Sequence, residues 1–366
     1  MPVRIAIVGT GNIARTHARA VAGIPSATLA GAMDVDSSRL DPFCEEYGVA
    51  EGCRDLGDLL SRARPDLVHI CTPPATHYAA ALECLNAGAS VLVEKPPVIS
   101  LRELDGLAAA QGPSRPGGTR EPPWFATVFQ HRFGSGQRRL KAVADSGALG
   151  RPLVAVCHTT WFRDQAYFDV PWRGGWDNEG GGPTMGHGIH QMDMLADVLG
   201  DWTEVSALAR TSARVMATED LSLAHVSFAN GAVASVVNSV LSPREETYLR
   251  FDYEYATVEV THLYGYADAD WRITPAKGHS GEVQAAWDDA EYGTKSGHAA
   301  QFAHVLDALR DGRQPPVAPG EARRTMSLVA GIYASAFTRR PVTPDDLAPG
   351  TPFYGAMNGG KTAPWQ

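Results

Sequence analysis

Long hydrophobic runs, blocks of like charge and internal repeats are all missing from this 366-residue sequence. No segment approaches the roughly 20 apolar residues that cross a bilayer, and no block of about five or six like charges occurs. The formal net charge is -9 at pH 7. These absences argue against a membrane or a nucleic acid as the main partner.

Cysteine is scarce as well. An odd number of cysteines is spread along the chain without a C-x-x-C pair: Cys44, Cys53, Cys71, Cys84 and Cys157. This spacing does not fit a disulfide framework or a zinc site, and it favours reduced thiols. The start, MPVRIAIVGTGN, lacks the cleavage site of a signal peptide. We therefore expect a cytoplasmic protein.

What is present is an ordinary globular composition, with 44% hydrophobic and 20% charged residues, in a chain long enough for two domains. In the first third, buried-strand patterns alternate with helices, as in VRIAIVG, a helix over 12–22 and TLAGAMD. LVHICTP and SVLVEKP continue the alternation, and WFATVFQHRF is the last predicted strand. QGPSRPGGTREPP, residues 111–123, is predicted as a surface loop. This order predicts a doubly wound parallel sheet over residues 1–132.

The pattern changes after residue 133. Two strand-like runs flank Asn230-Gly231, a strong hairpin signal, and TYLRFDYEYATVEVTHLYG contains a second pair of strands. Helices are expected near 137–146, 187–199, 299–311 and 321–338. These patterns predict an α+β domain with a mostly antiparallel open sheet over residues 133–345. The Pro/Gly-rich tail, residues 346–366, is predicted to be extended.

A glycine-rich turn follows the first strand. Gly9, Gly11 and Ala14 form G-x-G-x-x-A at the start of a helix, where backbone N–H groups and the helix dipole favour a pyrophosphate. Asp34 ends the second strand, where a carboxylate binds ribose hydroxyls and repels a 2′-phosphate. NAD is therefore favoured over NADP, although Arg39 is a nearby base. The predicted dinucleotide contacts in this region are Gly9, Thr10, Gly11, Asn12, Ile13, Asp34 and Arg39.

Lys95 stands at the carboxyl end of an otherwise apolar strand, and two prolines fix the backbone after it. Ligands of open α/β sheets bind at that edge. Together with the glycine-rich turn, EKP resembles the pattern of the Gfo/Idh/MocA family of nicotinamide-dependent sugar and cyclitol oxidoreductases. CTPPATH, FQHRF, SGALGRP, WRGGW and GGG…GIHQMD resemble the same family, from residue 3 to about residue 342.

The resemblance implies a Rossmann domain followed by an α/β domain whose open sheet often forms an oligomer face, so a homodimer or homotetramer is expected. It implies that Lys95 is a catalytic or substrate-orienting residue, whose ammonium would hydrogen-bond the reacting hydroxyl and favour an alkoxide-like transition state. It places Glu94 near the nicotinamide and Gln130 on the last strand of the first domain. The further cofactor contacts that it implies are Thr72, Pro73, His77, Glu94, Lys95 and Gln130.

GGGPTMGHGIHQMD contains two histidines three residues apart. Histidine supplies a base of suitable pKa for an alcohol proton, and the family pattern makes His190 that base. The pattern also implies an acid or amide four residues earlier on the same helix face, where this chain has Gly186. His187 is the nearest substitute, either as a substrate contact or in packing, and Asp193 is expected to be a capping or packing acid. No third ligand accompanies the histidines at a telling spacing, so no metal is expected.

The preceding segment, TTWFRDQAYFDVPWRGGWDNE, mixes aromatic rings with Arg and Gln. Stacking faces beside bidentate donors suit a polyhydroxylated ring. Arg163, Tyr167 and Trp172 are predicted to face the substrate, and Arg173 to touch the cofactor or the substrate. The alternative is that half of these aromatic residues belong to the core.

The leading hypothesis is hydride transfer between NAD and a secondary alcohol of a sugar, a sugar derivative or a cyclitol. Lys95 would polarise the C–O group and His190 would exchange the proton, while the cofactor carries the redox chemistry. One alternative is a glycoside-cleaving enzyme that oxidises transiently with tightly held NAD, which the altered position 186 keeps open. Another is a dinucleotide-binding sensor or co-repressor, which the retention of both catalytic residues disfavours.

Overall fold

The computed structural model describes residues 2–111, 122–290 and 292–365. Most of the predicted surface loop at 111–123 lies outside the described residues. The chain forms two compact units, and each is described by itself. The first unit contains residues 1–98, 103–128 and 298–322, and the second contains residues 99–102, 129–297 and 323–366. Among the described residues, no helix has the length and apolar character needed to cross a membrane.

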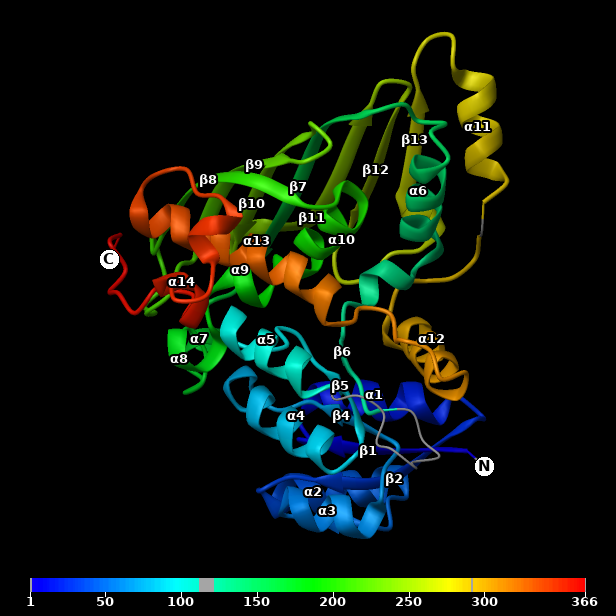
Figure 1. Cartoon of the computed structure of the whole chain (residues 1–366), viewed down its shortest axis with the longest axis vertical. Coiled ribbons are helices and arrows are strands. Elements are labelled where there is room, and N and C mark those ends of the chain that lie inside the picture. Colours follow the sequence, from blue (N-terminus) through cyan, green and yellow to red (C-terminus); the bar gives the residue numbers. More distant parts are fainter. Residues whose placement is uncertain (1, 112–121, 291, 366) are drawn as a thin grey trace. The chain divides into compact units, whose positions relative to one another are not determined.

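A six-stranded parallel sheet is the centre of the first unit, in the order β3-β2-β1-β4-β5-β6 (Figure 1). Its strands are β1 (Val3–Val8), β2 (Ala27–Met33), β3 (Gly52–Cys53), β4 (Leu67–Ile70), β5 (Ser90–Val93) and β6 (Phe125–Thr127). The helices of this part are α1 (Asn12–Ala22), α2 (Ser37–Tyr47), α3 (Leu56–Ala63), α4 (His77–Asn86), α5 (Leu101–Ala110) and α12 (His298–Arg310), with a 3-10 helix at Pro74–Thr76. This order confirms the predicted doubly wound sheet.

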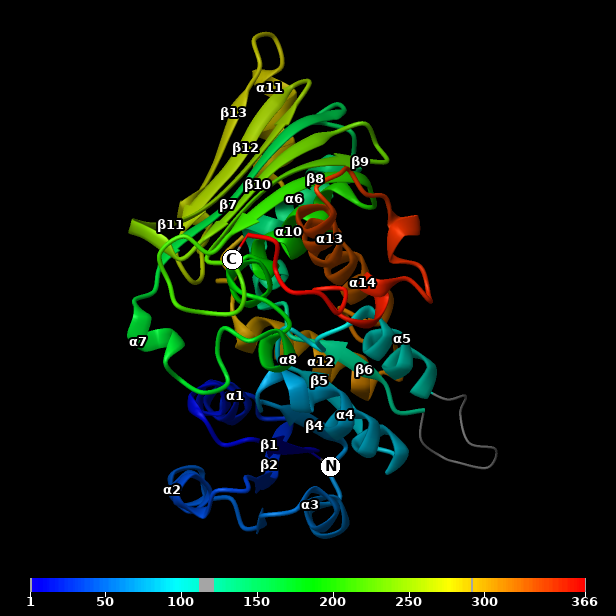
Figure 2. The ribbon, with the colours of Figure 1, turned by 90° about the vertical axis from the view of Figure 1, so that its left-hand side faces the viewer.

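Neighbouring residues on β2 face opposite helix layers. Ala32 is buried with Leu40 and Phe43 of α2. A Cβ on Gly31 would lie 2.7 Å from Leu59 of α3, so the glycine lets α3 pack close to the sheet. Figure 2 shows α2 and α3 on either side of β2. Helix α12 returns late in the sequence and packs against α1.

A seven-stranded sheet is the centre of the second unit, in the order β13-β12-β11-β7-β10-β9-β8. Strands β7 and β10 pair in parallel, and the other neighbours are antiparallel. Its strands are β7 (Pro152–Phe162), β8 (Trp202–Arg210), β9 (Leu221–Phe228), β10 (Val233–Ser239), β11 (Leu241–Tyr253), β12 (Ala256–His262) and β13 (Trp271–Pro275). The mostly antiparallel sheet and the hairpin at Asn230-Gly231 are confirmed.

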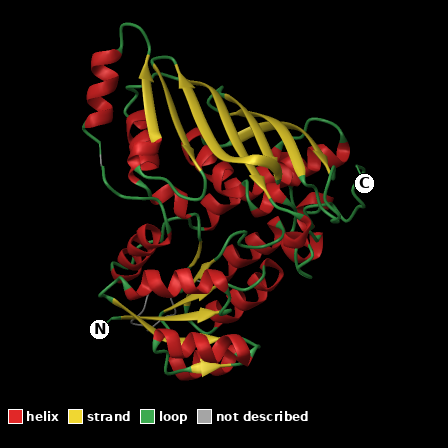
Figure 3. Cartoon of the chain, turned by 180° about the vertical axis from the view of Figure 1, so that it is seen from behind, coloured by secondary structure: helices red, strands yellow, loops and turns green. Residues whose placement is uncertain are grey.

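Helices α6, α10 and α13 lie along one face of this sheet (Figure 2), and Figure 3 shows its strands and the helices beside them from behind. The helices of this part are α6 (Ser135–Asp145), α7 (Gln165–Phe168), α8 (Trp176–Glu179), α9 (Pro183–Gly186), α10 (Ile189–Leu199), α11 (Ser280–Asp288), α13 (Pro319–Thr338) and α14 (Pro352–Gly355). Short 3-10 helices cover Gln130–Phe133, Asp268–Asp270 and Pro344–Leu347.

Two predicted elements were wrong in their extent. Strand β6 ends at Thr127, and Gln130 opens a 3-10 helix instead of continuing the strand. The backbone carbonyl of His131 accepts a hydrogen bond from the hydroxyl of Tyr266, and not from the backbone of a neighbouring strand. The tail is not simply extended, because prolines at two helix starts nucleate short helical turns there. Trp365 packs on Phe337, with ring centroids 4.7 Å apart.

The division of the chain also differs from the predicted one: residues 99–102 and 129–132 belong to the second unit, and a longer segment moves the other way. Residues 298–322 belong to the first unit, although they were expected in the second domain. Phe302 of α12 is buried with Ile5 and Leu92 of the parallel sheet. The sequence of a helix shows that one of its faces is apolar, but it does not show which sheet that face packs against. The return of α12 to the first unit could therefore not be predicted from local patterns.

Candidate active site

The glycine-rich turn after β1 is shaped for the close approach of a ligand. Gly9 has φ +86°, and a Cβ there would lie 2.8 Å from Cγ2 of Thr72. Gly11 is the N-cap of α1, and a Cβ there would meet nothing within 4 Å. No side-chain hydrogen bond caps the start of the helix. Ala14 is fully buried, which lets α1 pack closely on the sheet. This geometry suits a pyrophosphate.

Asp34 links this turn to the end of β2. Its Oδ2 accepts the N–H of Thr10 at 2.8 Å and the Thr10 hydroxyl at 3.0 Å, while Oδ1 accepts the N–H of Asp36 at 3.0 Å. A carboxylate has about four acceptor positions, so capacity remains for a ribose hydroxyl. Arg39 donates from Nε to Asp36 at 3.0 Å. Arg39 is therefore already paired with the carboxylate of Asp36. The site is thus better suited to NAD than to NADP, which carries a 2′-phosphate.

His77 joins two loops at the carboxyl edge of the sheet. Its Nε2 lies 2.7 Å from the carbonyl oxygen of Thr72, and its Nδ1 lies 2.9 Å from that of Pro96. The ring is fully buried. Because backbone carbonyls engage both nitrogens, His77 fixes the loop that carries Thr72 and Pro73 against the loop that follows β5.

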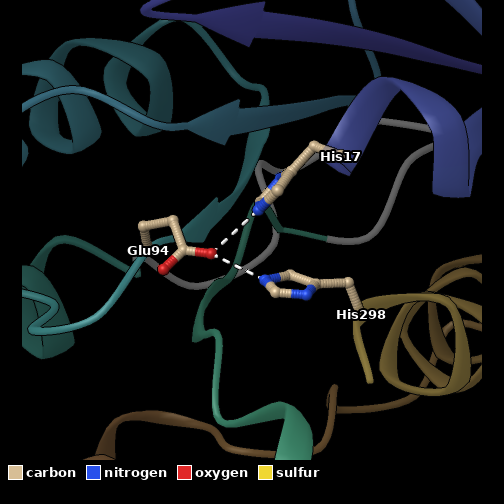
Figure 4. Close-up of side chains that lie close together, drawn as sticks. All are labelled: His17, Glu94 and His298. Carbon is tan, nitrogen blue, oxygen red and sulfur yellow. Dashed lines mark hydrogen bonds and ion pairs between the residues drawn. The ribbon is translucent and has the colours of Figure 1, made fainter. Parts of the chain in front are cut away.

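Glu94, directly after β5, lies beside two histidines (Figure 4). Its Oε1 is 2.9 Å from Nε2 of His17 on α1 and 3.0 Å from Nε2 of His298 on α12. Its Oε2 accepts the backbone N–H of Lys95 at 3.0 Å. Burial raises the pKa of Glu94, but the bonds from the two histidines outweigh it and hold that pKa well below its usual range. Glu94 is therefore an oriented carboxylate that fixes the backbone at Lys95.

The same cluster has the residue types of a metal site. Ligand atoms of His17, Glu94 and His298 lie within 4.8 Å of one another. However, 2.9 and 3.0 Å are hydrogen-bond distances, and Nδ1 of His17 continues the chain to Nδ1 of His69 at 3.1 Å. Burial lowers the pKa of both His17 and His69. The hydrogen bonds among these side chains account for the cluster, and we interpret it as a hydrogen-bond network around the Glu94 carboxylate.

In the second unit, the last two of three consecutive glycines pack against two buried residues, Tyr333 and Glu219. A Cβ on Gly181 would overlap the hydroxyl of Tyr333, and one on Gly182 would overlap the carbonyl of Glu219. The Glu219 carboxylate accepts the N–H of Gly182 at 3.1 Å, that of Thr184 at 3.0 Å and the hydroxyl of Tyr333 at 2.9 Å. Burial raises the pKa of Glu219. Close packing, not a ligand, therefore requires these glycines.

The helix predicted near 187–199 is confirmed over Ile189–Leu199, but it does not extend back to position 186, so Gly186 and His190 do not share one helix as expected. The N–H groups of His187 and Gly188 both donate to the carbonyl of Pro183, at 3.0 and 2.8 Å. Gly188 also lies against Asn238, whose side chain a Cβ would overlap. These contacts end α9 at residue 186, and α10 begins at residue 189.

The place of the implied acid is open. A Cβ on Gly186 would meet nothing within 4 Å. His187 lies instead among aromatic side chains, with its ring centroid 5.2 Å from that of Trp161 and its Nε2 3.5 Å from the hydroxyl of Tyr167. The structure thus places His187 beside the predicted substrate residues.

His190 is 7% exposed and stacks on His131, with ring centroids 4.7 Å apart. Nε2 of Gln191 lies 3.1 Å from Nδ1 of His131, and His262 approaches His131 edge-on at 5.5 Å. A ring held in this way has a fixed plane, which a proton-transferring base needs.

A buried ion pair anchors the helix that carries His190. Nε and Nη2 of Arg132 donate to the two oxygens of Asp193 at 2.6 and 2.7 Å, and the hydroxyl of Thr325 donates at 2.9 Å. Burial raises the pKa of Asp193 to about 6, and the guanidinium opposes that shift. Asp193 therefore acts in packing, where it ties α10 to the 3-10 helix that carries His131.

The predicted substrate residues form one connected surface. The guanidinium of Arg173 lies 3.9 Å from the ring centroid of Tyr167 and 4.2 Å from that of Trp172. The guanidinium of Arg163 lies 5.1 Å from the ring of Trp161 and 5.6 Å from that of Tyr167. We call the following set the aromatic wall: Trp161, Arg163, Tyr167, Trp172, Arg173 and Tyr264, whose hydroxyl accepts Nη2 of Arg163 at 2.7 Å.

Comparison with known families agrees with both units. Residues 3–112 match the model of an oxidoreductase family with an NAD-binding Rossmann fold, and residues 137–257 match the GFO/IDH/MocA C-terminal domain. The chain belongs to the GFO/IDH/MocA family. Its first unit is thus an NAD-binding Rossmann domain, and the glycine turn, the free helix start and Asp34 described above fit that cofactor.

Individual relatives are sugar and inositol dehydrogenases. D-glucoside 3-dehydrogenase of Escherichia coli is 31% identical over 206 residues, which cover 54% of this chain and 54% of that protein. The NAD(+)-dependent scyllo-inositol 2-dehydrogenase of Bacillus subtilis is 25% identical over 91% of this chain and 93% of that protein. The WlbA dehydrogenase of Bordetella pertussis, solved with NADH and UDP-GlcNAcA, superposes with a TM-score of 0.82 at 25% identity, covering 94% of this chain and 99% of that chain.

Several residues of the site were not predicted from the sequence. His17, His298, His131, Glu219 and Glu245 are the main ones. A signal existed only for His131, which lies within the FQHRF motif. The others approach their partners from distant segments, so only the fold reveals their roles.

Proposed function

We propose that the protein oxidises a secondary alcohol of a sugar, a sugar derivative or a cyclitol with NAD, in a reversible reaction. The chain spans about half the length of the E. coli relative to which it is 31% identical, so that enzyme's activity enters here as support for a proposal. One observation carries the proposal: this family member has Lys95 two residues after β5 of an NAD-binding unit and a buried, stacked His190 in the second unit.

NAD, when bound, supplies the redox chemistry by accepting a hydride from the carbinol carbon. We assign the remaining work to the chain. Lys95 donates a hydrogen bond to the reacting hydroxyl and stabilises negative charge on its oxygen. His190 takes the hydroxyl proton in oxidation and returns it in reduction. Glu94 holds the backbone of Lys95, and His131 holds the ring of His190.

The aromatic wall is proposed to bind the sugar or cyclitol ring, with His187 as a further contact. Aromatic faces pack against the C–H faces of a ring, and the side chains of Arg163, Tyr167 and Arg173 offer donors to its hydroxyls. Gly186 has no side chain at the position where the family pattern has an acid or an amide. We propose that His187 supplies the missing polar group.

A panel of sugars, methyl glycosides and inositols, incubated with NAD while the absorbance of the reduced nicotinamide is followed, tests the proposal. We expect reduction of NAD with at least one member, a rate at least about 100-fold lower for Lys95→Ala and His190→Ala, and NAD affinity within several-fold for both. Absence of NAD reduction with every member, by a folded protein that binds NAD, would contradict it. Product formation without net reduced cofactor would instead favour transient oxidation, as in a glycoside-cleaving enzyme.

We propose further that the protein is a homo-oligomer, associated through the open face of the seven-stranded sheet. Large apolar side chains are exposed on that face: Val154, Phe162, Leu208, Leu223 and Val233. Leu208 of β8 pairs with Leu223 of β9, so their side chains form a continuous apolar row. Four of the five cysteine thiols are buried and none is in a disulfide, which supports a reducing compartment such as the cytoplasm.

A further inference from the structure

Both arginines of the aromatic wall have a carboxylate partner. Nη1 of Arg163 donates to Oε1 of Glu245 at 2.9 Å. Nη1 of Arg173 lies 3.3 Å from Oε1 of Glu179 and also donates to the hydroxyl of Tyr167. Each guanidinium can therefore donate hydrogen bonds to a ligand without bringing a net positive charge to the wall.

Backbone donors hold these two carboxylates in place. Glu179 accepts the N–H of Gly174 at 2.5 Å, and Glu245 accepts the N–H of Phe162 at 3.0 Å. The bond from the Phe162 backbone, together with the bond from Arg163, lowers the pKa of Glu245 below its usual range. A ligand anion could take the place of either carboxylate only by leaving a backbone donor without its acceptor, which is costly.

A third guanidinium lies next to the wall but is directed at another ring. That of Arg214 lies 5.3 Å from the ring centroid of Phe162. Phe162 and Trp161 are consecutive residues of β7, so their side chains point to opposite faces of the sheet. The guanidinium of Arg214 therefore lies over a ring on the face that Trp161 does not occupy, and its Nε donates to the backbone carbonyl of Arg163 at 2.6 Å.

The remaining polar groups of the wall are also uncharged. Burial raises the pKa of Tyr167, so its phenol stays protonated at neutral pH, and the hydroxyl of Tyr264 accepts from Arg163. The indole ring of Trp172 beneath the Arg173 guanidinium supplies an apolar face. The wall thus combines stacking faces and hydrogen-bond donors with a closed balance of two positive and two negative side chains.

We propose that the aromatic wall selects an uncharged sugar or cyclitol ring and discriminates against rings that carry a carboxylate or a phosphate. A ring anion at the wall would meet two arginines that are already neutralised and two fixed carboxylates that repel it. This inference rests on the proposed function, because it names the substrate class of the same site. It assigns Glu179 and Glu245 as specificity residues.

Matched pairs of compounds that differ in one anionic group test the inference: methyl glucoside and methyl glucuronide, galactose and galacturonate, and myo-inositol and an inositol monophosphate. We expect kcat/KM for the neutral member to exceed that of its anionic partner by about tenfold or more. Calorimetric binding in the presence of NADH should show the same order. An anionic member that is turned over or bound as well as its neutral partner would overturn the inference and leave the proposed function intact.

Glu245→Gln sharpens the test, because it uncovers the charge of Arg163 while the amide oxygen still accepts the Phe162 N–H. We expect the neutral-to-anionic ratio to fall by about tenfold. Glu254→Gln is the matched control, because Glu254 holds Arg151 and a backbone N–H in the same way at the other end of β11. An equal change in both variants, or none in either, would overturn the assignment of Glu245.

Lack of turnover with every compound would contradict the proposed function, while the order of binding affinities would still report the charge preference of the wall. Binding of no compound would contradict both.

Discussion

The imidazole of His131 stacks on that of His190, with ring centroids 4.7 Å apart and ring planes inclined by 25°. His131 belongs to the motif FQHRF, and His190 to GIHQMD, so two separate motifs meet in this contact. The ion pair between Arg132 and Asp193 ties together the same two segments. The proposed base is therefore held by its neighbours in the fold, and its own helix supplies only part of its orientation.

His131→Ala should lower kcat about tenfold, because loss of a stacked ring worth roughly 0.5–1.5 kcal/mol frees the plane of His190. His131→Phe keeps an aromatic face and should retain most of the rate. Initial rates and NAD affinity measured for both variants check this prediction, with NAD affinity expected to stay within about twofold. Equal rates for the Ala and Phe variants would show that stacking has no positioning role.

His298→Leu should destabilise the first unit, because it removes one of the two side-chain partners of the buried Glu94 carboxylate. The expected loss in the free energy of unfolding is about 1–3 kcal/mol. His298→Gln retains an N–H donor and should lose less. Urea unfolding of both variants tests the network, and an identical loss in the two would indicate that ring packing alone matters at this position.

Gly182→Ala and Gly186→Ala form a matched pair within one motif. A Cβ at position 182 would overlap the carbonyl of Glu219, whereas a Cβ at position 186 would meet nothing within 4 Å. We expect the first change to cost about 1–3 kcal/mol of stability and the second to cost much less. Thermal unfolding of the two proteins measures the difference. A Gly186→Ala variant as unstable as Gly182→Ala would contradict the packing described around this turn.

Stability should decline as the pH falls below neutrality. Burial lowers the pKa of His17, His69 and His77, and it lowers that of His262 to about 4. A histidine whose pKa is lower in the folded state contributes stability above its unfolded pKa of about 6.5, and that contribution is lost as the pH falls towards the folded value. For His262 alone the loss is about 3 kcal/mol.

His262→Phe keeps the aromatic contacts with His131 and Tyr266 but does not titrate. The free energy of unfolding, measured in urea at neutral pH and near pH 5, should fall less for this variant than for the wild type. His225→Gln, a change at an exposed histidine, is the control and should behave as the wild type does. If the free energy of unfolding fell more between neutral pH and pH 5 in His262→Phe than in the wild type, the predicted role of His262 would be wrong.

Much of the first unit could be predicted because its elements carry local signals. The apolar strand before Gly9, the helix over 12–22 and the proline after Lys95 each mark a boundary in the sequence. The edge at which ligands bind then follows from the parallel order of the strands. The same reasoning could not place α12, since its contact with α1 depends on a return of the chain across a long separation.

The second unit shows where local reasoning fails. The helix predicted near 187–199 is present from residue 189 onward, but the packing of Gly188 against Asn238 separates His187 from it, and no local pattern announces that contact. Glu219 approaches the glycine turn from a loop that carries no motif. The residue types of the aromatic wall were predictable, whereas its charge balance depends on Glu245 of a distant strand.

The most direct test of the central claim follows the transferred hydrogen. A neutral substrate identified in the panel is labelled with deuterium at the carbinol carbon, and the released dinucleotide and sugar product are examined by mass spectrometry. We expect one deuterium in each reduced nicotinamide and none at the oxidised carbon of the product. Label retained in the product without labelled reduced dinucleotide, or label lost to water, would contradict net oxidation by NAD.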